Sequence, residues 1–198
     1  MWWIVGIGVL IALVWTFGKY RTATHQAQLI KAGRDHLWQS FRMLNVGSDR
    51  FFEAKVDERV WRDPYLLGYA QGSLAMMTTF FGKRLDTTQK GMVVVRVMQD
   101  MIGDGWQETC ERIAKLNADR DVQFARGMSH GGDVLILMAN RAGPNLLAEP
   151  DVQMALRKAP EQARLANAIF GSTDTGQSGA AGAVLMQEYM ERHAREAG

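Results

Sequence analysis

The residues best suited to acid–base or nucleophilic chemistry lie around His130. Ser129, His130 and Asp133 surround a pair of glycines, and these residue types serve as nucleophile, base and acid in many enzymes. A catalytic set is defined by distances in the fold, so adjacency in the sequence is weak evidence for one. An enzyme is therefore the alternative interpretation, with a site assembled from dispersed polar residues: Asp104, Glu108, His130 and Asp133.

The segment 171–178 (GSTDTGQS) has the glycine spacing of a phosphate-binding loop and stands before a helix. Gln177 occupies the place where such a loop needs a lysine to contact the phosphates. The preceding segment also has the pattern of a helix, whereas a nucleotide-binding fold would supply a strand there. We expect Gly171–Gly182 to be a flexible, glycine-rich connector instead.

A second incomplete pattern resembles a calcium loop. Asn117, Asp119 and Asp121 alternate like the first ligands of such a loop. Val122 stands where the loop needs a glycine, and Met128 stands where it needs a bidentate glutamate. A polar helix start explains these residues better.

The remaining metal-binding residue types are scattered. His25, His36 and His193 lack the close pairing of a zinc site. Cys110, the only cysteine, cannot form an internal disulfide and favours a reducing compartment. The sequence therefore predicts neither a metal nor a cofactor.

Composition limits the class of protein and its partners. The chain is 47% hydrophobic and 22% charged, which is close to the average for globular proteins and predicts a folded domain. A net charge of +2 without a basic cluster argues against nucleic acid, because phosphate binding needs many cations on one face.

The N-terminal segment has the pattern of a membrane anchor. Trp2–Gly18 contains no charged residue, and as a helix it would be about 25 Å long, near the lower limit for spanning a hydrocarbon core. Aromatic residues suited to the membrane interface stand at its two ends: Trp2, Trp3, Trp15 and Tyr20. No basic segment precedes it and no small-residue cleavage site follows, so we expect a retained anchor over residues 1–20.

The flanking charges predict how this anchor is oriented. Four basic residues come before the first acidic one, Asp35, and form a positive-inside flank: Lys19, Arg21, Lys31 and Arg34. We expect a single-pass protein of a bacterial-type inner membrane with its C-terminal domain in the cytoplasm; the alternative is a periplasmic domain. Gly8, Ala12 and Thr16 form a small-residue stripe on the anchor, which could support self-association.

The rest of the chain predicts an all-α fold, in which one transmembrane helix is followed by a compact multi-helix domain. A basic connector helix is expected over residues 21–46 and a helical soluble domain over 47–198. Asp63-Pro64 is the clearest helix start, and Asp86-Thr-Thr-Gln89 has the form of a capping box. The uncharged stretch 64–82 is interpreted as a central buried helix whose Gly68, Gly72 and Ala75 form a groove for close helix contact.

Two further predictions concern the domain. Pro160 should kink or divide the helix that begins near Pro150. Four aromatic residues with helical spacing around them could form a partner groove, although core packing also explains them: Trp38, Trp61, Tyr65 and Tyr69. Because no catalytic or cofactor signature is complete, the leading hypothesis is an accessory or scaffold subunit that binds membrane lipid through its anchor and another protein through its domain.

Overall fold

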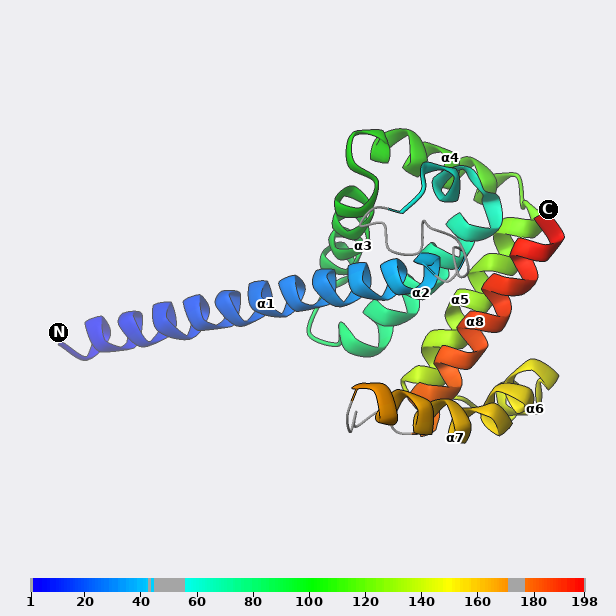
Figure 1. The fold of residues 1–198 in the computed structure, drawn as a ribbon. Coiled ribbons are helices and arrows are strands. Elements are labelled where there is room, and N and C mark those ends of the chain that lie inside the picture. The colour runs from blue at the N-terminus through cyan, green and yellow to red at the C-terminus, as the bar shows by residue number, and fades with distance from the viewer. Residues whose placement is uncertain (1, 43, 45–55, 171–176, 198) are drawn as a thin grey trace.

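The fold is built from helices, and no strand occurs in the part of the chain that the structure describes. The computed structural model describes residues 2–42, 44, 56–170 and 177–197, and for residues 2–21, 162–170, 177–178 and 197 it describes the backbone alone. The predicted all-α class is confirmed. The elements, shown in Figure 1, are α1 (Trp2–Arg42), η3 (Glu58–Arg62), α2 (Pro64–Phe81), α3 (Thr87–Ile102), η4 (Gly103–Gly105), α4 (Trp106–Ala118), α5 (Val122–Met138), α6 (Pro144–Ala148), α7 (Pro150–Phe170) and α8 (Gln177–Ala197).

Helix α1 has two halves with different surroundings. Its first half projects away from the other helices, and its second half packs into them (Figure 1). Leu29, Leu37 and Phe41 recur on one face and are 5%, 0% and 1% exposed, and burial of each side chain contributes about 1.5–3 kcal/mol. The core therefore begins within the stretch that the sequence assigns to the connector helix.

The predicted anchor falls on the projecting half. Within the described part of the chain, no helix combines the length and the apolar character needed to cross a membrane. The backbone of the anchor is helical, but its side chains lie outside the described residues. This applies to the interface aromatics, the small-residue stripe and the first two flanking bases: Trp2, Trp3, Trp15, Tyr20, Gly8, Ala12, Thr16, Lys19 and Arg21.

Helix α2 is the central helix of the domain, as predicted from its uncharged sequence. Leu67, Tyr69, Ala70 and Leu74 are each 0% exposed. The Asp63 side chain caps its N-terminus by accepting a hydrogen bond from the backbone N–H of Leu66 at 3.0 Å, and Pro64 follows at the first helical position. Both features are local signals, which is why the sequence alone located this start.

Helices α2 and α5 cross at backbone contact distance because glycines line both sides of the crossing. On α2, a Cβ added to Gly68 would overlap the carbonyl oxygen of Phe124, and one added to Gly72 would overlap that of Met128. On α5, a Cβ added to Gly127 would overlap the carbonyl oxygen of Tyr65, and one added to Gly131 would overlap that of Tyr69. The predicted groove of Gly68 and Gly72 is thus occupied by α5, whereas the third predicted member, Ala75, is exposed.

The remaining helices surround this pair. Asp86 begins α3 with both hydrogen bonds of the predicted capping box. The backbone N–H of Gln89 donates to Asp86 Oδ1 at 2.8 Å, and the backbone N–H of Asp86 donates to Gln89 Oε1 at 3.1 Å. Helix α8 lies along α5, and α7 packs against α8 at one end of the domain (Figure 1). Helix α3 lies beside the point where the projecting half of α1 leaves the domain.

One local prediction is narrowed and another needs correction. Helix α7 continues through Pro160 to Phe170, so of the two predicted effects of Pro160, a kink or a division, the division does not occur. Helix α8 begins at Gln177, so it includes the second half of the segment predicted as a connector, while residues 171–176 lie outside the description. The physical reason is close packing: Ala180 and Ala181 are buried, and a Cβ on Gly182 would overlap the side chain of Met138 on α5.

Candidate functional site

Four aromatic rings from α2, α5 and α8 form a chain of ring contacts around His130, the residue on which the catalytic alternative centres. The rings of His130 and Tyr189 stack with centroids 3.8 Å apart and planes within 8°. Tyr65 meets His130 edge-on, with the ring planes 78° apart, and its hydroxyl lies 2.8 Å from His130 Nδ1. The ring of His193 stacks on Tyr65 at 4.3 Å. We call His193, Tyr65, His130 and Tyr189 the ring stack.

Two ion pairs and one contact between a histidine and a carboxylate lie beside the ring stack or within it. Arg192 contacts both carboxylate oxygens of Asp151 at 2.9 Å, joining α8 to α7. Arg126 contacts both carboxylate oxygens of Glu196 at 2.8 and 3.3 Å, joining α5 to α8. His193 Nε2 lies 3.0 Å from Asp63, the residue that caps α2. These pairs connect the helices at their ends, where the backbone leaves polar groups without intrahelical partners.

The protonation states of the stack follow from burial. Burial, together with the positive charges of Arg126 and Arg192, lowers the pKa of His130 from 6.5 to about 4. Burial also raises the pKa values of Tyr65 and Tyr189. At neutral pH all three rings are therefore uncharged. A neutral His130 imidazole that carries its proton on Nε2 can accept a hydrogen bond at Nδ1 from the Tyr65 hydroxyl.

Two carboxyl groups near the ring stack, those of Asp63 and Asp133, have pKa values that shift in opposite directions. Burial alone would raise the pKa of Asp63, but hydrogen bonds from His193 and from the Leu66 N–H outweigh it, and the pKa is lowered. The pKa of Asp133 is raised, first by burial and then by the negative charge of Glu149. Asp63 is thus held as an anion, which suits a helix cap paired with His193.

These values favour a structural role for the ring stack. A general base works best when its pKa lies near the operating pH, and a nucleophilic hydroxyl needs a neighbouring base that can take its proton. His130, with a pKa of about 4, is a weak base at neutral pH, and the raised pKa of Tyr65 holds its proton. The stack is therefore suited to holding α2, α5 and α8 together.

The other dispersed residues of the enzyme hypothesis lie elsewhere. Glu108 borders a cavity of about 210 Å³ together with Trp61 and Arg112, and Asp104 lies in the turn η4. None of the three cavities described here is bordered by His130 or Asp133. In the described part of the chain, no group of three or more His, Cys, Asp or Glu residues is placed to hold a metal ion.

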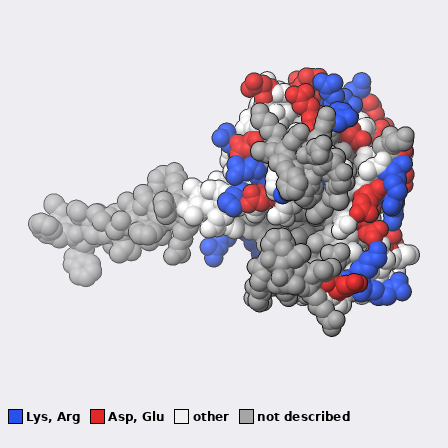
Figure 2. Space-filling model, viewed as in Figure 1, with Lys and Arg blue, Asp and Glu red and all other residues white. Residues whose placement is uncertain are grey.

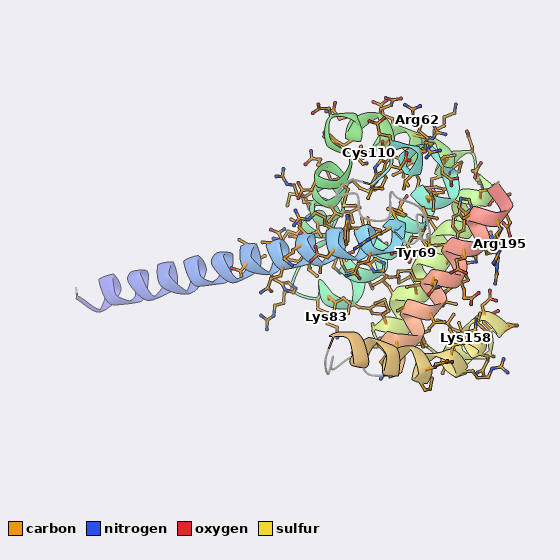
Figure 3. All side chains as sticks on the ribbon, viewed as in Figure 1. Arg62, Tyr69, Lys83, Cys110, Lys158 and Arg195 are labelled. Carbon is orange, nitrogen blue, oxygen red and sulfur yellow. The ribbon has the colours of Figure 1, made fainter. Side chains whose placement is uncertain are left out.

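The four aromatic residues predicted as a partner groove divide into two pairs. Tyr65 and Tyr69 are 2% and 0% exposed and belong to the core, where Tyr69 lies at the centre of the domain (Figure 3). Trp38 and Trp61 border a cavity of about 480 Å³, although Trp61 itself is 6% exposed and packs edge-on against Phe41. A partner role for these four residues stays a prediction.

The groove that the sequence did not predict lies between α3 and α4. It has a volume of about 260 Å³ and is bordered mainly by apolar side chains: Val94, Val95, Met98, Ile113 and Ala114, with Gln71, Cys110 and Asn117. Val95 at its edge is 39% exposed and Met92, one turn earlier on α3, is 52% exposed. Because three helices contribute to it, no local sequence pattern could have identified it.

One residue that borders the groove has an unsatisfied polar atom. The side-chain oxygen of Gln71 is buried and has no hydrogen-bond partner among the described residues. A buried acceptor without a partner destabilises a protein by about 1–3 kcal/mol. Cys110, which is half-buried at the same groove, has its pKa raised by burial, so its thiol stays protonated at neutral pH. The groove therefore offers a mainly apolar surface, and the unsatisfied acceptor belongs to one of the residues that border it.

The sequence contains the residues of the ring stack at helical spacing on separate helices, but nothing in it shows that these helices pack together. Arg126 and His130 are one helical turn apart on α5, as Tyr189 and His193 are on α8. Polar pairs at this spacing on amphipathic helices indicate a shared face, but only the packing of α5 against α8 shows that the two faces meet. In comparisons with known proteins, no protein-family model, no curated protein and no solved structure matches this chain.

Proposed function

We propose that this chain is a membrane-anchored accessory or scaffold subunit that binds a partner protein in the apolar groove between α3 and α4. The observation that carries the proposal is the combination, in one groove, of exposed Val95 and the buried, unpartnered oxygen of Gln71. A volume of about 260 Å³ is below the range of about 300–1,000 Å³ that is usual for small-molecule sites. It suits an anchoring side chain of a partner helix, which also supplies the missing hydrogen-bond donor.

The enzyme alternative has less support from the geometry. His130 and Asp133 border none of the described cavities, and the pKa of His130 is too low for a base at neutral pH. An accessory subunit needs neither feature. It needs a rigid domain, which the ring stack and the close crossing of α2 and α5 would provide, and one apolar binding surface, which the α3–α4 groove would provide.

The binding test is the recovery of a partner with full-length, tagged protein extracted in a mild detergent. We expect a stoichiometric partner with the unchanged chain and a loss of about tenfold or more with Val95→Arg, because a charge in the groove would be desolvated by the partner. The matched control is Val122→Arg, since Val122 is another exposed valine, at the start of α5 and outside the groove. Thermal unfolding of both variants checks that the domain remains folded.

Two outcomes would contradict the groove as the binding surface. The first is retention of the partner by Val95→Arg at the level of Val122→Arg. The second is recovery of the full-length chain alone, as a monomer, under conditions that preserve other membrane complexes. The second outcome would favour the enzyme alternative over the accessory subunit.

The membrane part of the proposal rests on the sequence of Trp2–Gly18, which lacks charge and is followed by Lys19 and Arg21. We expect the domain to face the cytoplasm. Val122→Cys in a Cys110→Ala background places one thiol at a site that is 77% exposed. A membrane-impermeant maleimide should label it in inverted inner-membrane vesicles and leave it unlabelled in spheroplasts; the reverse pattern would show a periplasmic domain.

A further inference from the structure

The turn between α2 and α3 lies on the side of the domain from which the projecting half of α1 leaves. His25 Nε2 is 2.8 Å from the backbone carbonyl of Phe81, and because a carbonyl can only accept, the imidazole donates this bond. Leu85, which is 5% exposed, holds the turn in the core. Lys83 and Arg84 between them are exposed, and Figure 3 places Lys83 close to α1 on this side.

The exposed groups of this turn, one aromatic ring and two positive charges, are of the kinds that contact the surface of an anionic membrane. Phe81 is 49% exposed, so its ring is available to contact a second surface. Lys83 and Arg84 add two positive charges, and the acid that follows, Asp86, is engaged as the cap of α3. Lys and Arg side chains also border α1 where it enters the domain (Figure 2). An aromatic ring beside basic groups is the pattern of interfacial membrane contacts.

The position of the turn along α1 places it near the headgroups if the anchor spans the membrane. His25 lies about two helical turns beyond Gly18, the last residue of the uncharged segment, which corresponds to about 10 Å along the axis. The polar layer on each side of a bilayer is about 5–8 Å thick. Flexible Lys and Arg side chains can extend over the remaining distance, and charges attract over about one Debye length, roughly 8–10 Å.

We propose that Phe81, Lys83 and Arg84 form a second membrane contact, in which the α2–α3 turn docks on anionic phospholipid headgroups of the leaflet that α1 enters. The inference rests on the proposed anchor. It adds a function for the turn: two contacts, one through α1 and one through the turn, fix the orientation of the domain on the membrane. The hydrogen bond from His25 to the Phe81 carbonyl joins the turn to α1 and so connects the two contacts.

The test uses the full-length chain in lipid nanodiscs that carry a headgroup-level spin-labelled quencher. In a Cys110→Ala background, a fluorescent label on Thr87→Cys reports on the turn, since Thr87 is exposed at the start of α3. The same label on Val122→Cys is the distant control. We expect the Thr87 label to be quenched about twofold more in discs with anionic phosphatidylglycerol than in neutral phosphatidylcholine discs, with no such difference at Val122.

Charge reversal separates this contact from the anchor. Lys83→Glu with Arg84→Glu should abolish the lipid-dependent quenching at Thr87, while reversal of two exposed bases elsewhere, Lys115→Glu with Arg120→Glu, should leave it unchanged. Thermal unfolding checks that both double variants are folded. Recovery of the protein in discs with no lipid-dependent quenching at Thr87, or with quenching that survives reversal at Lys83 and Arg84, would overturn the contact alone. Recovery of the chain outside the discs would overturn the anchor and, with it, the contact.

Discussion

Gly68→Ala and Gly127→Ala should each destabilise the domain by at least about 3 kcal/mol, the upper range for overpacking a core. In both cases the new methyl group would overlap a backbone carbonyl of the facing helix, Phe124 for Gly68 and Tyr65 for Gly127. A backbone cannot move aside as a side chain can, so α2 and α5 would have to separate. Either change removes a large part of a total stability of about 5–15 kcal/mol, and thermal unfolding followed by circular dichroism should show a Tm that is lower by about 10 °C.

Two matched controls isolate this effect from the change in helix propensity. Gly132→Ala lies in the same helix, α5, but its Cβ would meet the Met76 side chain at 3.6 Å, an ordinary contact. Gly91→Ala lies on exposed α3 with nothing within 4 Å and should raise stability by up to about 1 kcal/mol. Equal effects of Gly68→Ala and Gly132→Ala would show that the two backbones are not in direct contact.

The stability of the domain should also fall as the pH drops from 7.5 to 5. Burial lowers the pKa of His36 from 6.5 to about 4, and its Nε2 is buried without a hydrogen-bond partner among the described residues. Below pH 6.5 the unfolded chain therefore binds a proton that the folded chain excludes, which favours unfolding. From His36 alone the free energy of unfolding should decrease by about 2 kcal/mol over this interval, and His130 acts in the same direction because its pKa is lowered as well.

The measurement is denaturant unfolding of the full-length protein in detergent at several pH values from 7.5 to 5. Asp63 and Asp151, whose pKa values are lowered from 3.8, contribute their pH dependence below this interval. His36→Gln should flatten the profile, and His36→Gln with His130→Gln should flatten it further. A profile that is the same with and without His36 would contradict the buried, neutral state assigned to this imidazole.

Local signals account for the parts of the fold that the sequence predicted. The start of α2 at Asp63-Pro64 and the capping box at Asp86 and Gln89 depend on residues within one turn of each other, so they can be interpreted without knowing the fold. The burial of α2 followed from its lack of charge. Leu29, Leu37 and Phe41 likewise lie at helical spacing in the sequence, and the structure buries all three on one face of α1.

Predictions from composition alone were less reliable. The glycine-rich segment 171–182 was expected to be a connector, but Gly182 belongs to α8 because only a residue without a side chain fits against Met138. Glycine is frequent both in flexible segments and at close helix crossings, and composition does not distinguish the two. The same ambiguity affected Tyr65 and Tyr69, since aromatic residues are common both in cores and at interfaces.

By itself, the sequence determined the helical class, the caps, the buried faces and the uncharged N-terminal segment, because each depends on residues that are neighbours along one helix. Only the tertiary structure decided which faces meet. It brought Tyr65, His130, Tyr189 and His193 into one chain of ring contacts, and it formed the α3–α4 groove, which is bordered by Gln71 with its unpartnered oxygen. These features depend on distances between residues far apart in the chain, and such distances are set by how helices pack and not by the pattern within any one of them.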